Sequence, residues 1–453
     1  MNNLIQKYNI PGPRYTSYPT VPFWDNNGFT KQGWVGTFQR SFDESNVEEG
    51  ISIYIHLPYC ESLCTFCACN KRITKQHSVE IPYIDTVLKE WKLYVDLFSS
   101  RPKIKEIHLG GGTPTFFSSE NLKKLIDGIF EYADAAEGHE FSLEGHPNNT
   151  TKEHLQVLYD LGFRRISYGV QDYDLKVQKA INRVQPFENV KRATEEAREI
   201  GFSSISHDLI FGLPHQTMEG MLETINLTKQ LNPDRISFYS YAHVPWIKGV
   251  GQRGFHEEDL PTPELKRALY EEGKKMFEEM NYFEIGMDHF ALEHDSMYQS
   301  MKEHTLHRNF MGYSSSKTQL MVGLGVSSIS DSWYSFAQNE KTVEEYEKSI
   351  QNGELSVFKG HILSEEDLIM RRHILNLMCN LETSWADESM RFDDVERIKT
   401  MLQGMVDDNL IEFVENGLIV KEQGRPFVRN VCMTFDKRMI DNEPETRIFS
   451  MTI

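Results

Sequence analysis

The chain has 453 residues, of which 39% are hydrophobic and 25% charged, and its formal net charge at pH 7 is -19. This length is enough for two or three structural units with a large buried core. The acidic balance excludes a broad surface for nucleic acid or for an anionic membrane, because both need clustered Lys and Arg. No apolar run approaches the roughly eighteen residues needed to cross a bilayer.

Alternating apolar runs recur along the first half of the chain, with helical stretches between them. Strands are expected over residues 51–57, 104–109, 140–145, 165–170, 204–211 and 235–242. Amphipathic helices are expected over residues 82–98, 119–133, 151–160, 188–200 and 217–231. Six such units predict an α/β fold, an open partial (β/α)6 barrel. Its ligands should gather at the carboxyl ends of the parallel strands.

The second half has a different pattern. A helix is expected over 261–281, and later two helices, 364–380 and 392–408, precede a hairpin with Asn416-Gly417 at its turn. This order predicts a mainly helical, winged-helix-like C-terminal domain with an interaction or lid role. The expected units are an N-terminal arm over the active site (1–45), the barrel (46–250), a barrel extension with a substrate-site segment (251–360) and the C-terminal domain (361–453).

Four cysteines fall within ten residues directly after the first expected strand: Cys60, Cys64, Cys67 and Cys69. Thiolates held this close together suit a soft metal or an iron–sulfur cluster. A structural zinc ion with Cys69 as the fourth ligand is an alternative. A disulfide is disfavoured because only six cysteines and no signal peptide indicate a reducing, cytoplasmic compartment. The Cys-x3-Cys-x2-Cys spacing resembles the signature of radical S-adenosylmethionine (SAM) enzymes. In them three thiolates hold a 4Fe–4S cluster, and SAM chelates the fourth iron.

Glycines and polar residues cluster where the expected strands stop. Gly110-Gly111-Gly112-Thr113-Pro114 follows the second strand, and Glu144, Gln171 and Asp208 end later ones. A glycine triplet lets backbone groups approach a ligand closely, but without a following Lys-Ser/Thr it is no phosphate loop. Each polar residue alone is more often structural; their recurrence at one end of a barrel indicates a binding site.

Nearly the whole chain resembles one family, the oxygen-independent coproporphyrinogen III oxidases, which are radical SAM enzymes of haem synthesis. The likeness includes Pro13-Arg-Tyr-Thr-Ser-Tyr-Pro19, the cysteine run with its extra Cys69, Gly-Gly-Gly-Thr-Pro, Gly169-Val-Gln-Asp172, Asn182-Arg183, Asp208-Leu-Ile-Phe-Gly-Leu-Pro214 and His307-Arg-Asn-Phe310. Related haem chaperones generally lack the first two segments. The resemblance therefore favours the oxidase.

The resemblance implies particular site residues. Cys60, Cys64 and Cys67 match the cluster ligands, and Cys69 is expected to take part in catalysis. The positions that match two adjacent SAM sites are Tyr54, Phe66, Gly111, Gly112, Thr113, Glu144, Gln171, Arg183, Asp208, Ala242 and Ile329. The chain departs from the family at Met311, where Gln is usual, so one polar contact of the second SAM site is lost.

The implied reaction converts coproporphyrinogen III to protoporphyrinogen IX by decarboxylating two propionates. A 5′-deoxyadenosyl radical is required because an unactivated carbon does not yield hydrogen to a side-chain base, and a low-potential donor supplies the electron. The carboxylates of the substrate predict a basic patch, for which the candidates are Arg14, Lys71, Arg72, Arg253 and Arg308. We expect a monomer that binds neither nucleic acid nor membrane. A haem-degrading radical SAM methyltransferase and a haem-binding chaperone are the alternatives.

Overall fold

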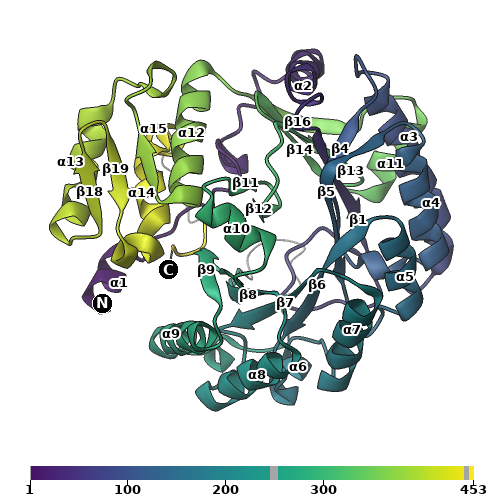
Figure 1. Cartoon of the computed structure of the whole chain (residues 1–453), viewed down its shortest axis with the longest axis horizontal. Helices are drawn as coiled ribbons and strands as arrows, with labels where there is room; N and C mark the ends of the chain where they lie inside the picture. Colours follow the sequence, from purple (N-terminus) through teal and green to yellow (C-terminus); the bar gives the residue numbers. More distant parts are fainter. Residues whose placement is uncertain (1, 245–251, 253, 443–447, 453) are drawn as a thin grey trace.

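The computed structural model describes residues 2–244, 252, 254–442 and 448–452. In this part of the chain the main sheet has twelve strands, ordered β16-β15-β14-β13-β1-β4-β5-β6-β7-β8-β10-β9. The strands of its parallel centre are β1 (Ile51–Leu57), β4 (Lys103–Gly111), β5 (Asp134–Gly145), β6 (Phe163–Gln171), β7 (Ser204–Phe211) and β8 (Arg235–Ser240). The six strands expected from the sequence are confirmed, and they curve into an open barrel (Figure 1).

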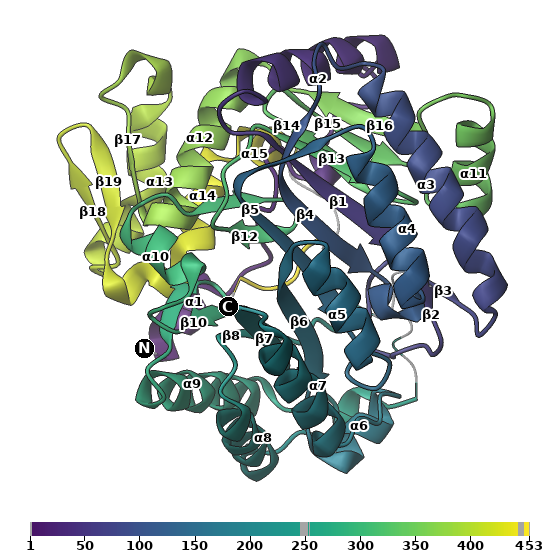
Figure 2. The same cartoon turned by 45° about the vertical axis from the view of Figure 1, so that its right-hand side comes forward.

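Helices cover the outer face of this barrel, as Figure 2 shows. They are α3 (Glu80–Val95), α4 (Ser119–Phe130), α5 (Lys152–Asp160), α6 (Leu175–Ala180), α7 (Phe187–Ile200) and α8 (Met218–Leu231). Alternate strand residues such as Ile53, Ile55, Ile107 and Leu109 are fully buried in the core. Because side chains alternate across a strand, the residues between them face the inside of the barrel. The short helix α6 was not expected.

The two edges of the sheet come from the second half of the chain. On the β1 side the strands are β13 (Leu320–Leu324), β14 (Ile329–Ser332), β15 (Ser335–Asn339) and β16 (Val357–Ile362). β13 runs parallel to β1, with Ile53 opposite Val322, and the next three strands are antiparallel. The other elements of this half are α9 (Pro263–Glu279), β9 (Phe283–Gly286), β10 (His289–Ala291), α10 (Ser296–Lys302), β11 (His307–Asn309), β12 (Gly312–Ser314) and α11 (Val343–Gln351).

The C-terminal segment forms a separate hydrophobic core beside the barrel (Figure 1). Its elements are α12 (Glu365–Asn380), β17 (Glu382–Ser384), α13 (Val395–Asp407), β18 (Ile411–Val414), β19 (Gly417–Val420), α14 (Val428–Phe435) and α15 (Lys437–Asp441). The expected hairpin is confirmed, and β17 adds a third strand to it. The winged-helix-like prediction therefore holds. No described helix is long and apolar enough to cross a membrane.

The N-terminal arm packs against both parts of the fold. Helix α1 (Asn2–Tyr8) and the buried Tyr15 and Tyr18 join the C-terminal core, whereas α2 (Lys31–Ser45) lies on the β13–β16 edge of the sheet. Arg429 fixes the arm by donating to the carbonyl oxygens of Gly12 and Pro13. The expected division of the chain near residues 45, 250 and 360 stays a prediction.

Candidate active site

The cysteine loop, residues 60–69, leaves the carboxyl end of β1 through Pro58. The short strands β2 (Tyr59–Cys60) and β3 (Arg72–Ile73) pair in parallel and close its two ends. Farther along, the backbone N–H of Thr65 donates to Ile181 O at 3.0 Å, and Asn182 Nδ2 donates to Leu63 O at 2.7 Å. The loop is therefore held at both ends and in its middle, which fixes the positions of its sulfurs.

Cys60, Cys64 and Cys67 are free, partly exposed thiols that line one cavity of about 780 Å³, which we call the cysteine cavity. Thr113 Oγ1 donates to the sulfur of Cys60 at 3.4 Å. Within the described ranges, no three His, Cys, Asp or Glu side chains have the geometry of a single-ion site. A cubane takes one thiolate at each of three corners.

The thiols of the cysteine loop differ in pKa. A hydrogen bond from Cys69, opposed by burial and helped by the ammonium of Lys71, lowers the pKa of Cys67 to about 6. The same hydrogen bond raises the pKa of Cys69 well above its usual value. Burial raises the pKa of Cys60 to about 11. Cys69 thus acts as a hydrogen-bond donor to Cys67.

The glycine triplet brings the end of β4 against the start of the cysteine loop. Gly112 N donates to Leu57 O at 2.8 Å and Thr113 N to Tyr59 O at 3.0 Å. A Cβ on Gly112 would lie 2.7 Å from the carbonyl carbon of Pro58, and Gly111 has a φ of +112°. Glycine is required at both positions, by close packing at the first and by left-handed backbone at the second.

The residues predicted to bind SAM meet mostly in the cysteine cavity. Those that line it are Phe66, Gly111, Gly112, Thr113, Glu144, Gln171, Arg183 and Asp208. Gln171 has a φ of +68°, unusual for a residue with a side chain. Among the described residues, its Oε1 and the Nε of Arg183 are buried without a hydrogen-bond partner. Unpaired buried polar atoms at a cavity are what a polar ligand would satisfy.

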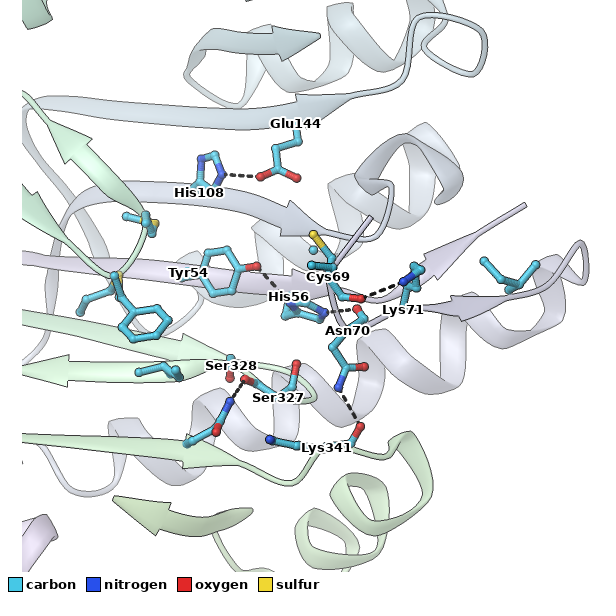
Figure 3. Close-up of a pocket in the computed structure, with 18 of the residues that line it drawn as sticks. Tyr54, His56, Cys69, Asn70, Lys71, His108, Glu144, Ser327, Ser328 and Lys341 are labelled. Atoms are coloured by element: carbon cyan, nitrogen blue, oxygen red, sulfur yellow. Dashed lines mark hydrogen bonds and ion pairs between the residues drawn. The ribbon is translucent and has the colours of Figure 1, made fainter. Parts of the chain in front are cut away.

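A second cavity, of about 800 Å³, adjoins the first, and Figure 3 shows the residues that line it. It contains the predicted residues Tyr54 and Ile329 together with Met311, and it shares Cys69, Lys71, Gly111 and Glu144 with the cysteine cavity. We keep the name second cavity for it. The two cavities therefore meet at a common wall that includes the end of the cysteine loop.

Glu144 is the acidic residue of this common wall. Its Oε1 lies 3.4 Å from His108 Nε2. Burial acts to raise the pKa of Glu144, but the hydrogen bond and the charge of His108 outweigh it, so the pKa is lowered. Asp208, which also lines the cysteine cavity, differs: burial raises its pKa to about 6 although Ser167 Oγ donates to it at 3.0 Å.

A buried network on the outside of the barrel holds one wall of the second cavity. Glu90 of α3 is fully buried and accepts hydrogen bonds from Gly325 N (2.7 Å), Asn339 Nδ2 (2.6 Å) and Tyr346 OH (2.7 Å). Asn339 Nδ2 also lies 3.1 Å from the hydroxyl of Ser328, which lines the cavity. Burial raises the pKa of Glu90 to about 7.

Several predicted residues lie outside both cavity linings. Ala242 O accepts from Gln252 Nε2 at 2.7 Å. Arg14 forms an ion pair with Asp288, and Arg72 with Glu344. Arg308 donates to the backbone carbonyls of Tyr15 (3.1 Å) and Arg14 (3.0 Å), so it holds the N-terminal arm. Arg253 lies outside the described residues.

Sequence reasoning missed seven polar residues of the second cavity, namely His56, Asn70, His108, Ser327, Ser328, Gln338 and Lys341. The histidines had a usable signal, because His56 follows Tyr54 at the strand period of two and His108 lies opposite Tyr54 on β4. Ser328 and Lys341 had none. They reach the cavity only through the pairing of β13 with β1.

Comparisons with known proteins agree with this geometry. Residues 54–228 match the model of the radical SAM superfamily. The oxygen-independent coproporphyrinogen III oxidase of Helicobacter pylori strain J99 is 38% identical, covering 99% of this chain and 98% of the relative. The protein of the same name from Escherichia coli K12 is 36% identical, covering 96% and 94%. The chain belongs to this family. The solved structure of coproporphyrinogen III oxidase from Escherichia coli, described as a radical SAM enzyme, matches with a TM-score of 0.89 at 33% identity, covering 96% and 98%.

The family's cofactors are a 4Fe–4S cluster and SAM, and the protein is a radical SAM oxidoreductase. The residues of the cysteine cavity fit both groups. Three thiols supply soft ligands for the cluster. Glu144 and Asp208 offer hydrogen-bond acceptors for an amine or hydroxyls, and Arg183 offers donors for a carboxylate.

Proposed function

We propose that the protein catalyses the oxygen-independent oxidative decarboxylation of coproporphyrinogen III to protoporphyrinogen IX in haem biosynthesis. The observation that carries this proposal is the similarity over nearly the full length of both chains to relatives of that name. The likeness extends beyond the barrel to the N-terminal arm and the C-terminal domain, because the Escherichia coli structure is covered to 98%.

We assign the cluster to Cys60, Cys64 and Cys67, and one molecule of SAM to the rest of the cysteine cavity. When bound, these groups supply a carbon radical that can take hydrogen from an unactivated carbon. Arg183 holds the carboxylate of SAM through a charge-assisted contact, and Phe66 packs on its adenine. Asp208 accepts from a ribose hydroxyl. Cys69 and Glu144 act at the wall that the two cavities share.

Ala242, Tyr54 and Ile329 stay proposed SAM contacts. Ala242 lies outside both cavity linings, and the other two line the second cavity. We keep Arg14, Arg253 and Arg308 as proposed substrate contacts. Both residues also hold the N-terminal arm in place. Arg14 does so through its ion pair with Asp288, and Arg308 through its hydrogen bond to the backbone of Tyr15.

The proposal includes a low-potential electron donor and a cytoplasmic location. All six cysteines are free thiols, which supports a reducing compartment. The monomeric state and the absence of a nucleic-acid or membrane partner stay predictions.

Anaerobic incubation of the reconstituted protein with coproporphyrinogen III, SAM and dithionite, followed by mass spectrometry of the porphyrins, tests the function. We expect loss of mass equal to two formic acid units, which is two CO2 and four hydrogen atoms. Haem supplied in place of coproporphyrinogen should be unchanged. A methylated, ring-opened product from haem would favour the methyltransferase. Tight haem binding with neither product would favour the chaperone.

A further inference from the structure

The turn that carries Arg183 begins at the end of helix α6. The chain reverses at Asn182, which has a φ of +51°, and asparagine adopts this left-handed conformation more readily than most residues. Arg183 N donates to Gln178 O at 2.8 Å, and Asn182 N donates to Lys179 O at 3.2 Å. These two hydrogen bonds form a Schellman motif, which ends a helix and turns the chain back over its last residues. The backbone of Arg183 is therefore bound to the end of α6.

Gln178 is a buried amide in the same part of α6, and it is 4% exposed. Its Oε1 accepts from Gln185 N at 3.0 Å, and its Nε2 donates to Gln185 O at 2.8 Å and to Asp172 O at 2.9 Å. All three hydrogen bonds go to main-chain groups. Asp172 directly follows Gln171, so one side chain joins the end of β6 to the segment after Arg183. The acceptor and both N–H donors of the amide are used in this way.

Gln185 completes this connection from the other side. It is fully buried, and its Nε2 donates to Gly169 O at 3.2 Å. The same carbonyl oxygen accepts from Arg183 Nη2 at 2.6 Å. A Cβ on Gly169 would lie 2.9 Å from Arg183 Nη2, so the close approach of the guanidinium to β6 requires glycine. The direction of the guanidinium is thus set by β6 and α6 together.

The end of α6 also holds the cysteine loop. Ala180 O accepts from Thr65 Oγ1 at 3.1 Å, and Ile181 O accepts from Thr65 N at 3.0 Å. One short helix therefore positions both the arginine and the loop that carries the thiols. The side chain of Gln178 takes no part in the contacts with Thr65, so the two roles of α6 can be separated by substitution.

We propose that Gln178, together with Gln185, is a positioning residue that directs the guanidinium of Arg183 at the carboxylate of SAM. This inference rests on the proposed function, which places SAM in the cysteine cavity. Arg183 is among the described residues that line this cavity, whereas Gln178 and Gln185 line neither cavity. Both glutamines therefore act through the arginine. The Nε of Arg183 is buried without a hydrogen-bond partner among the described residues, so it reaches a ligand only where the turn places it.

The test uses Gln178→Met, which keeps the approximate length of the side chain and removes the amide. Thr194→Val is the matched control, because Thr194 is fully buried on α7 and its Oγ1 lies 3.0 Å from His207 Nε2, outside both cavity linings. The anaerobic, cluster-loaded proteins are titrated calorimetrically with SAM and with decarboxylated SAM. We expect Gln178→Met to weaken SAM binding about tenfold and binding of decarboxylated SAM less than about twofold. Iron content should stay normal, since the contacts of α6 with Thr65 remain.

The same substitution is then made in Arg183→Ala. If Gln178 acts through Arg183, adding Gln178→Met should lower SAM affinity by less than about twofold, because the group that it directs is gone. Thr194→Val should bind SAM like the wild type, even where its thermal midpoint falls as far as that of Gln178→Met. Equal losses of SAM affinity in the two backgrounds would overturn the inference, since they would indicate a general structural defect.

Unchanged SAM affinity in Gln178→Met would overturn the inference as well. If the wild type decarboxylates coproporphyrinogen III in that case, the proposed function stands. Conversely, the expected differences in SAM binding together with a wild type that releases no CO2 would contradict the proposed function alone.

Discussion

Arg183 donates from Nη1 to the sulfur of Cys64 at 3.7 Å, and its Nη2 donates to Gly169 O at 2.6 Å. The guanidinium thus connects the cysteine loop to the end of β6. Its remaining Nε is buried, with no hydrogen-bond partner among the described residues. One arginine therefore contacts a proposed cluster ligand and keeps a donor at the proposed SAM site.

Replacing Arg183 by Ala should weaken SAM binding by about 2 kcal/mol, because a hydrogen bond to a charged group is lost. Iron content should stay normal, since Arg183 is no ligand. Anaerobic calorimetric titration with SAM measures the change. Arg40→Ala, an exposed arginine paired with Glu44 on α2, is the control and should bind SAM normally. Unchanged affinity in Arg183→Ala would remove this residue from the site.

Single substitutions of Cys60, Cys64 or Cys67 by Ala should each abolish the 4Fe–4S chromophore, because a cubane with two protein thiolates is labile. Cys69→Ala should keep it, since the thiol of Cys69 donates to Cys67. Iron and sulfide analysis after anaerobic reconstitution distinguishes the two results. A stable, SAM-binding cluster in Cys64→Ala would show that the ligand assignment is wrong.

Gly112→Ala should displace the start of the cysteine loop. The new Cβ would lie 2.7 Å from the backbone of Pro58, which cannot rotate away as a side chain could. We expect lower iron content and lower SAM affinity at similar expression. Gly36→Ala is the matched control, because a Cβ there meets nothing within 4 Å on helix α2. Normal cluster content and SAM binding in Gly112→Ala would argue against close packing at this position.

Tyr346→Phe should lower the thermal midpoint, and more so at pH 8 than at pH 6. Burial raises the pKa of Glu90 to about 7 from a usual 4.5, so this group favours the folded state less as pH rises through that interval. The tyrosine hydroxyl stabilises the ionised form. Its removal raises the pKa further and costs about 2 kcal/mol where Glu90 is ionised. Calorimetry at the two pH values measures this, and an equal shift at both would contradict it.

The reaction should consume SAM in a fixed ratio. We expect two molecules of 5′-deoxyadenosine and two of CO2 for each coproporphyrinogen III, because each propionate requires its own hydrogen abstraction. A monovinyl porphyrinogen should appear first and then decay. Quenched time points analysed by liquid chromatography give these amounts. Release of 5′-deoxyadenosine without CO2 would indicate an uncoupled reaction or another substrate.

The barrel could be predicted from the sequence because the alternation of apolar residues along each strand can be recognised within a few consecutive residues. Strands such as β1 and β7 begin and end where the alternating apolar runs do. β5 begins at Asp134 rather than at residue 140, because its first residues lack apolar alternation, are mostly exposed and pair only with the start of β4. A strand made of solvent-facing residues has no apolar alternation to detect.

The cysteine cavity was also predictable, since its residues follow strands that the sequence reveals and end at one edge of the sheet. The second cavity was predictable only in part, through residues such as Tyr54 and Ile329. Its wall residues Ser327, Ser328 and Lys341 belong to a segment that reaches β1 only through the parallel pairing of Ile53 with Val322. Such long-range pairing depends on tertiary packing, which leaves no local signal in the sequence. The same applies to Arg308. The sequence analysis proposed it as a substrate contact, whereas in the fold its guanidinium donates to the backbone carbonyl of Tyr15.

The shared wall of the two cavities has a thermodynamic consequence. Cys69, Lys71, Gly111 and Glu144 line both, so an occupant of one cavity contacts the groups that receive the other. Two ligands that share contacts bind with a coupling free energy, and that coupling is reciprocal. By whatever factor an occupant of one cavity changes the affinity for an occupant of the other, the second changes the affinity for the first by the same factor.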